Sequence, residues 1–155
     1  MKLLLENWRK YTADEPSVVP NREDMVEFLM NNPHQEIHLD NPKGSAKGFG
    51  RTEKVSLPFD YGEYSAIINP ADNMGWDLII VPSSNEKDKN LIPVGIVDYH
   101  ADPEIWKKVG KKMNDDNENN SKIVIADRGQ YSQEDKELIN NFFSTLVQFK
   151  PVVWF

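Results

Sequence analysis

Residues 78–81, Leu-Ile-Ile-Val, constrain the fold more than any other stretch of the chain. Four consecutive apolar residues without polar alternation indicate a strand that is buried on both faces. Residues 91–99 form the next strongest predicted strand, and we expect these two strands to form the centre of a sheet. The remaining predicted strands are short runs at residues 36–39, 52–57, 63–68 and 122–126, with a final edge strand at 152–155.

Four segments show helical patterns. Residues 2–11 place apolar side chains one helical turn apart, which predicts a short amphipathic helix. A second helix is expected after the N-cap residue Asn21, and a third after Asp102, where a proline stands at the first helical position. The last helix has the clearest pattern, because Ser132 and Asp135 have capping-box spacing and an apolar stripe follows them. We expect this helix to pack across the sheet.

The composition limits the classes of protein to which the chain can belong. A length of 155 residues with 39% hydrophobic content suits one compact domain, which we divide into an N-terminal helical extension, residues 1–33, and a β-rich part, residues 34–155. The net charge of -7 disfavours nucleic acid as a partner, and the lack of cysteine excludes disulfides and thiolate metal sites. No apolar run reaches the roughly 18 residues that a membrane span needs, so we expect a soluble, cytoplasmic protein.

The turn that leads into residues 78–81 carries two aspartates, Asp72 and Asp77, with Gly75 between them. Glycine relaxes the backbone, so one turn could direct both carboxylates at a hard cation such as Mg2+. Clusters of Asp, Asn and Gly are also ordinary turn sequences. Spacing alone therefore does not separate a metal platform from a solvated turn.

A glycine-rich stretch at residues 42–51 carries three basic side chains, Lys43, Lys47 and Arg51. They could bind phosphate, but no Walker pattern is present and no helix follows, which leaves a solvated hairpin loop as the alternative. Tyr61 adds a hydroxyl that could hydrogen-bond a phosphate oxygen or simply pack in the core.

A second metal motif is formed by His100, which lies between Asp98 and Asp102 at strand spacing. The three side chains could face one side and bind a transition metal. Asp102 is also expected as a helix N-cap, and a single histidine more often serves as a hydrogen-bonding group. The Asp72–Asp77 turn is therefore the preferred metal platform.

In sequence order, these segments resemble motifs of the soluble, Mg2+-dependent inorganic pyrophosphatases, from residue 36 to residue 155. Residues 40–45, Asp-Asn-Pro-Lys-Gly-Ser, resemble that family's acidic residue followed by Ile-Pro-Lys-Gly-Ser. Residues 72–77 resemble its signature Asp-x-Asp-Pro-x-Asp. Tyr61 and Gly62 are similar to its Asn-Tyr-Gly, and the pair Phe-Phe at residues 142–143 is similar to that of its closing helix.

The resemblance implies an α+β fold built on a small mixed or antiparallel, OB-like β-barrel of about five strands, with flanking helices and the C-terminal helix packed on the barrel. It also implies hydrolysis of diphosphate to two phosphates by a water molecule that Mg2+ activates. Asp72 and Asp77 would be the catalytic residues. The metal ligands would be Asp40, Asp72, Asp77 and Asp102, and the phosphate ligands would be Lys47, Arg51, Tyr61 and Lys150.

Two positions depart from the family pattern and keep other interpretations open. Met74 stands where the signature has its middle aspartate, and a thioether neither accepts a proton nor holds Mg2+. Asn120 stands where a further metal-binding aspartate is expected. The alternatives are a non-catalytic relative that serves as a binding module, with residues 2–11 docking a partner, and an unrelated small barrel. The opening of the chain also resembles viral proteins, which would place it in a host cytoplasm, and homo-oligomerisation stays open.

Overall fold

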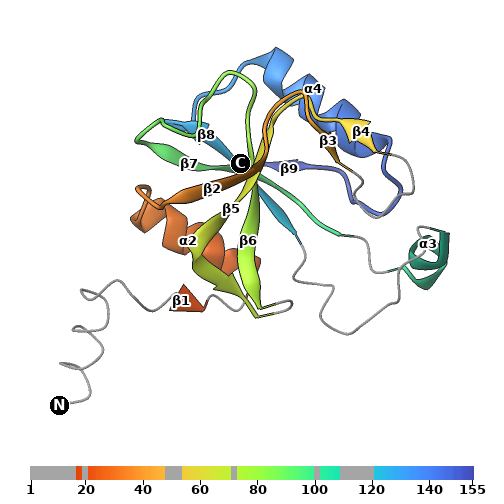
Figure 1. The fold of residues 1–155 in the computed structure, drawn as a ribbon, viewed down its shortest axis with the longest axis horizontal. Coiled ribbons are helices and arrows are strands. Elements are labelled where there is room, and N and C mark those ends of the chain that lie inside the picture. The colour runs from red at the N-terminus through yellow and green to blue at the C-terminus, as the bar shows by residue number, and fades with distance from the viewer. Residues whose placement is uncertain (1–16, 19–20, 48–53, 71–72, 100–101, 109–120) are drawn as a thin grey trace.

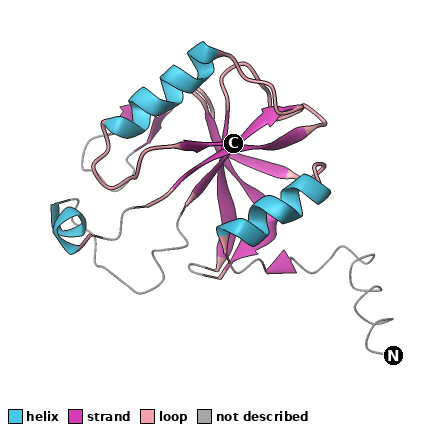
Figure 2. Cartoon of the chain, turned by 180° about the vertical axis from the view of Figure 1, so that it is seen from behind, coloured by secondary structure: helices cyan, strands magenta, loops and turns pink. Residues whose placement is uncertain are grey.

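The computed structural model describes residues 17–18, 21–47, 54–70, 73–99, 102–108 and 121–155. A seven-stranded sheet forms the middle of the molecule, and a long helix lies on each side of it (Figure 1). The view from behind shows the same two helices separated by the strands (Figure 2). The helix predicted at residues 2–11 lies outside the described residues.

The sheet has the strand order β1-β5-β6-β8-β7-β9, and β2 also pairs with β5. Two of its pairings, β1 with β5 and β6 with β8, are parallel, and the other four are antiparallel. A separate two-stranded hairpin consists of β3 and β4. The strands are β1 (Ser17–Val18), β2 (Ile37–Asn41), β3 (Ala46–Lys47), β4 (Val55–Ser56), β5 (Asp60–Asn69), β6 (Met74–Ile80), β7 (Leu91–Val97), β8 (Lys122–Asp127) and β9 (Val153–Trp154).

The described helices are α2 (Arg22–Asn31), α3 (Pro103–Lys108) and α4 (Gln133–Ser144). Asn21 caps α2, because its side-chain oxygen accepts a hydrogen bond from the backbone N–H of Asp24 at 2.9 Å. At α4, the Ser132 hydroxyl accepts from the Asp135 N–H at 3.0 Å, and the Asp135 carboxylate accepts from the Ser132 N–H at 2.9 Å. These two predicted N-caps are confirmed.

Helix α2 covers one face of the sheet. Met25 and Leu29, one helical turn apart, are both buried against it. Trp76 is fully buried in this layer, and its indole N–H donates to the carbonyl of Ile68 at 3.2 Å. The other buried members of this layer are Tyr64, Ile67, Leu78, Ile80, Leu91, Ile123 and Ile125.

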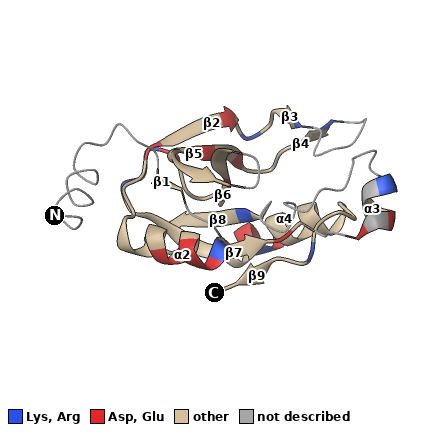
Figure 3. Ribbon diagram, turned by 90° about the horizontal axis from the view of Figure 1, so that it is seen from below, with Lys and Arg blue, Asp and Glu red and all other residues tan. Residues whose placement is uncertain are grey.

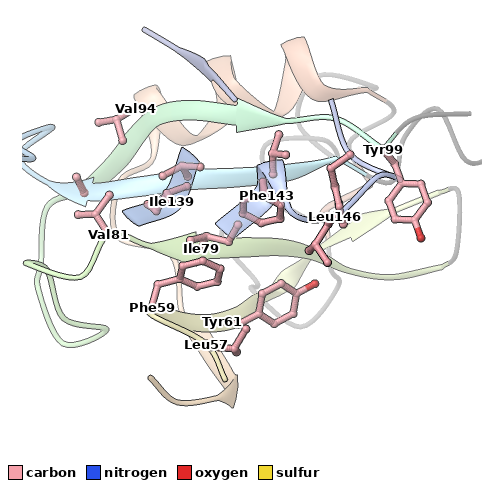
Figure 4. Packing of buried hydrophobic residues seen from close by; sticks show 14 residues of the cluster. Leu57, Phe59, Tyr61, Ile79, Val81, Val94, Tyr99, Ile139, Phe143 and Leu146 are labelled. Atoms are coloured by element: carbon pink, nitrogen blue, oxygen red, sulfur yellow. The ribbon is translucent and has the colours of Figure 1, made fainter. Parts of the chain in front are cut away.

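Helix α4 covers the opposite face, where a second apolar layer collects (Figure 4). Phe143 lies at its centre, with ring centroids 5.9 Å from Phe59 and 5.0 Å from Phe149. In Figure 4, Tyr61 and Tyr99 lie toward the end of this layer that is opposite to Val81 and Val94.

The apolar run that constrained the fold is buried as predicted. Leu78, Ile79 and Ile80 are each fully buried in β6, which lies between β5 and β8 in the sheet. The strand expected over residues 91–99 ends at Val97, and β7 lies further out, between β8 and β9. No helix in the described part of the chain is long and apolar enough to cross a membrane.

The fold is α+β with a mostly antiparallel sheet, but the described strands do not close into the expected barrel. At one edge β9 pairs only with β7, and at the other edge β1 and β2 pair only with β5. Helices α2 and α4 bury both faces, so the apolar side chains are covered without closure of the sheet. The barrel expectation is therefore corrected to an open sheet between two helices.

Candidate functional site

A row of four ionisable side chains crosses the α4 face of the sheet, one on each of four neighbouring strands. His38 of β2 is opposite Glu63 of β5, and Glu63 is opposite Asp77 of β6. The parallel register of β6 and β8 then places Lys122 beside Asp77. We call His38, Glu63, Asp77 and Lys122 the charged row. Figure 3 shows acidic residues on β2 and β5 and a basic residue on β8, within the sheet itself.

The ion pair between Lys122 and Asp77 is the centre of the charged row. The Lys122 ammonium donates to the Asp77 carboxylate, and the two side chains are 6% and 24% exposed. A buried ammonium needs a compensating charge, because its desolvation in the protein costs several kcal/mol, on the order of the Coulomb gain from its partner. Asp77 is therefore the counter-charge of Lys122 inside the sheet.

Two ammonium groups contact the ring of Tyr61, which is 3% exposed and precedes Glu63 by two residues on the same face of β5. The Lys47 ammonium lies 4.5 Å from the ring centroid, and that of Lys122 lies 5.9 Å from it. Both separations are within the range of cation–π attraction. The β3–β4 hairpin thus brings a second positive charge beside the charged row.

Glu63 and Asp77 place two carboxylates on adjacent strands. Gly75 makes room for Glu63, since a Cβ atom at position 75 would lie 3.0 Å from the Glu63 Oε2 atom and 2.6 Å from the carbonyl oxygen of Tyr64. The Glu63 carboxylate therefore lies against the backbone of β6, two residues before Asp77. Like charges directly opposite each other are unfavourable, and Lys122 offsets this repulsion.

Asp40 lies at the β2 end of the charged row. Its Oδ1 atom is 3.4 Å from Nε2 of His38, and both side chains are exposed enough to contact solvent. On the same face of the sheet, burial raises the pKa of Tyr99, and the positive charge of Lys122 acts in the opposite direction. The field of Lys122 therefore extends from Asp77 toward β7.

The structure brings together four of the residues predicted from sequence: Asp40, Lys47, Tyr61 and Asp77 lie in or beside the charged row. Arg51 and Asp72 lie outside the described residues. Asp98, part of the alternative metal motif, binds Arg22 of α2 at 2.5 Å.

Two predicted residues have other contacts. The Asp102 carboxylate accepts from the N–H of Glu104 at 2.8 Å and caps α3, which Figure 1 shows to one side of the sheet. Lys150 is exposed, and its backbone N–H donates to the carbonyl of Asp98 at 2.8 Å. Neither contact involves the charged row.

Sequence reasoning missed Lys122, Glu63 and His38 as site residues. Lys122 was expected only as the first residue of a strand, and no motif distinguishes Glu63 or His38 from other charged strand residues. The available signal was alternation: Lys122 precedes the buried Val124 by two positions, which places its side chain on the same face. Register across four strands, which the sequence does not reveal, assembles the row.

The metal-binding capacity of the site is limited in the part of the chain that the structure describes. No group of three or more His, Asp or Glu side chains there is arranged to hold a metal ion. Glu63 and Asp77 supply carboxylate oxygens, the donor type that Mg2+ prefers, and Mg2+ commonly uses one or two carboxylates and keeps water ligands. The two carboxylates are thus of the ligand type that Mg2+ prefers. One of them, that of Asp77, also forms the ion pair with Lys122.

A pocket of about 390 Å3 opens elsewhere, where β6 and β8 end and α4 begins. Its lining residues are Ser83, Ser84, Asp127, Gln130, Tyr131 and Ser132. Burial raises the pKa of the adjacent Asp135, but hydrogen bonds from Ser83 and Ser132 outweigh this effect and hold the pKa below its usual value. Asp135 thus stabilises the helix start and the loop after β6.

Comparison of the chain with protein-family models, with curated proteins and with solved structures finds no match.

Proposed function

We propose that the charged row binds a small diphosphate ligand and, with Mg2+, hydrolyses it to two phosphates. The observation that supports this proposal is the convergence of Lys47 and Lys122 on the Tyr61 ring, directly beside Glu63 and Asp77. Phosphate recognition needs positive charge at a fixed position. The chain as a whole has a net charge of -7, whereas two ammonium groups meet at the Tyr61 ring.

Each residue has a chemical role in the proposed reaction. Lys47 and Lys122 would neutralise the phosphate oxygens, and Tyr61 would orient both ammonium groups. Asp77 and Glu63 would supply two carboxylate groups to the cation, which would keep water as its other ligands. Mg2+, when bound, would supply a Lewis acid and lower the pKa of a coordinated water.

The pyrophosphatase resemblance adds further expectations to this proposal. Asp72 and Arg51 keep their proposed roles as a metal ligand and a phosphate ligand, and Asp102 and Lys150 remain weaker members of the same set. An OB-like arrangement of the strands would also follow from membership of that family. The proposal does not depend on Asp72, Arg51, Asp102 or Lys150. It is supported by the residues of the charged row, which strand pairing places side by side.

The experiment is phosphate release from inorganic diphosphate with the purified chain and Mg2+. A Lys47→Met variant should reduce kcat/KM by about tenfold or more, because it removes one phosphate-binding charge, on the order of 1.4 kcal/mol. Lys136→Met is the matched control, since the Lys136 ammonium also lies 5.9 Å from an aromatic ring, that of Trp154. Equal rates in both variants, or no release by the unmodified chain, would contradict the hydrolase proposal.

A second candidate function is diphosphate binding without hydrolysis, which Met74 favours. Met74 is the first residue of β6 and is 59% exposed, so the position that the signature gives to an aspartate carries an exposed thioether side chain. If the native chain binds diphosphate but releases no phosphate, and Met74→Asp gains release, the site is a binding site that has lost its catalytic carboxylate. Activity in the native chain would reject this candidate.

A further inference from the structure

We infer that the pocket beyond the carboxyl ends of β6 and β8 binds a neutral sugar ring. The pocket has a volume of about 390 Å3, which is at the lower end of the range for small-molecule sites and suits a single ring. It is formed by the loops that follow two parallel strands and by the start of α4, and none of its lining residues belongs to the charged row. The inference is therefore independent of the proposed function.

Hydrogen bonds between the loops hold the pocket in shape. The Ser84 hydroxyl accepts from the N–H of Asp127 at 2.9 Å, and the Ser83 hydroxyl donates to the Asp135 carboxylate at the start of α4. The turn after β8 is closed by a hydrogen bond of 3.0 Å from the Gln130 N–H to the Asp127 carbonyl. Because these bonds join separate segments of the chain, a ligand does not have to order the lining residues when it binds.

The lining residues offer both donors and acceptors to a ligand. Ser84 and Ser132 each use the hydroxyl oxygen to accept a backbone N–H, so the hydrogen of each hydroxyl can be donated to a ligand. The carboxylate of Asp127, whose side chain is 36% exposed, can only accept, and the Gln130 amide can do both. A sugar hydroxyl also donates and accepts, so it can pair with each of these groups.

The charges at the pocket favour a neutral ligand over a charged one. Asp127 supplies the one carboxylate among the six lining residues, and this carboxylate would repel an anion. The Arg128 guanidinium lies 4.0 Å from it, so a cationic ligand would compete with a positive charge that is already present. The Asp135 carboxylate accepts from Ser83 and Ser132, which commits it to the loop and the helix start.

Tyr131 gives the pocket an apolar wall. Its ring packs against that of Trp154, with the two centroids 4.9 Å apart, which fixes the orientation of the tyrosine. A tyrosine side chain combines an apolar ring with a polar hydroxyl. The C–H groups on one face of a sugar ring form a matching apolar surface, while its hydroxyls reach the serine and aspartate groups. The pocket thus has both kinds of surface that a sugar ring needs.

The test is a titration of the 15N-labelled chain with three sugars that differ in charge: neutral methyl glucoside, anionic methyl glucuronide and cationic methyl glucosaminide. Methyl glucoside should bind with a Kd of about 1 mM, as expected for a weak ligand of its size. It should shift the amide resonances of Ser84 and of residues 127–132. The two charged sugars should bind at least about threefold more weakly.

Two variants test the contacts separately. Asp127→Asn should weaken binding of methyl glucoside by about fivefold, because an amide oxygen is a weaker acceptor than a carboxylate. Tyr131→Leu changes no charge and should weaken binding by a similar factor, because it removes the aromatic wall. Glu27→Gln is the matched control, since it makes the same carboxylate-to-amide change at an exposed position of α2 and should leave the affinity unchanged.

Three results would overturn the inference. These are no amide shifts with methyl glucoside up to about 20 mM, tighter binding of either charged sugar, and equal affinity in Asp127→Asn and Glu27→Gln. Shifts at Tyr61 and Glu63 in place of the pocket residues would also contradict it. Each of these results leaves the diphosphate proposal to be decided by its own assay of phosphate release.

Discussion

The ion pair between Asp77 and Lys122 should be worth more to stability than any exposed ion pair of this chain. Asp77→Asn removes the carboxylate that the buried Lys122 ammonium binds, which should lower the free energy of unfolding by about 3 kcal/mol. Lys122→Met removes the ammonium that binds Asp77 and leaves the Asp77 carboxylate opposite that of Glu63. Because Asp77 keeps 24% exposure, this variant should lose about 2 kcal/mol.

The double variant Asp77→Asn/Lys122→Met removes both charges. It should be less destabilised than the sum of the single variants by about 2 kcal/mol, since neither charge is then stranded. Urea unfolding followed by tryptophan fluorescence measures all four proteins, and the fully buried Trp76 makes the signal sensitive to loss of the core.

The matched control is the pair Asp127 and Arg128, whose charged atoms are 4.0 Å apart and whose side chains are 36% and 71% exposed. A double-mutant cycle there should give a coupling of about 0.5 kcal/mol or less. If the Asp77–Lys122 cycle were equally small, the two side chains would not form a buried pair in solution, and the account of the charged row would be refuted.

Three further predictions follow from the packing and the helix cap. Phe143→Ala should cost about 3–5 kcal/mol by opening a cavity under α4, whereas Leu138→Ala on the exposed side should cost less than about 1 kcal/mol in the same urea experiment. Gly62→Ala should cost about 1–3 kcal/mol, because its Cβ would lie 2.3 Å from the His38 carbonyl oxygen; thermal melting measures this, and an unchanged Tm would contradict the close strand contact. The folded pKa of Asp135 lies below its unfolded value, so its stabilisation is complete above pH of about 4 and is lost as pH falls through the folded pKa. The stability gap between the unmodified chain and Asp135→Asn should therefore narrow on acidification, and a gap that does not change between pH 7 and pH 3 would contradict the hydrogen bonds assigned to this carboxylate.

Local features of the fold could be predicted because their causes are local. Asn21 caps α2 and Ser132 pairs with Asp135 in a capping box, and each contact spans only three residues. The buried run of β6 also carries its own signal, since Leu78 to Ile80 leave no polar position that could face water.

The open sheet could not be predicted, because barrel closure depends on pairing between strands that are far apart in sequence. The sequence contains enough short strands for a barrel, but it does not state that Val153 pairs with Ile96 or that β9 stops there as an edge. The helices at 22–31 and 133–144 cover both faces instead, which is a tertiary outcome.

The candidate site was predictable in part for the same reason. Asp77 and Tyr61 stand in recognisable motifs, whereas Lys122 is 45 residues from Asp77 and meets it only through the parallel register of β6 and β8. Glu63 joins them through the antiparallel register of β5 and β6. Single-sequence patterns report which face a residue occupies, but not which residues lie beside it on neighbouring strands.

The most direct test of the central claim is to locate bound diphosphate on the chain by amide chemical shifts in 15N-labelled protein with Mg2+. We predict that the largest shifts fall on residues of the charged row and its neighbours, above all Tyr61, Glu63, Asp77 and Lys122. Shifts gathered instead around Ser83 and the start of α4, or no shifts at millimolar diphosphate, would contradict the assignment of the charged row as the ligand site.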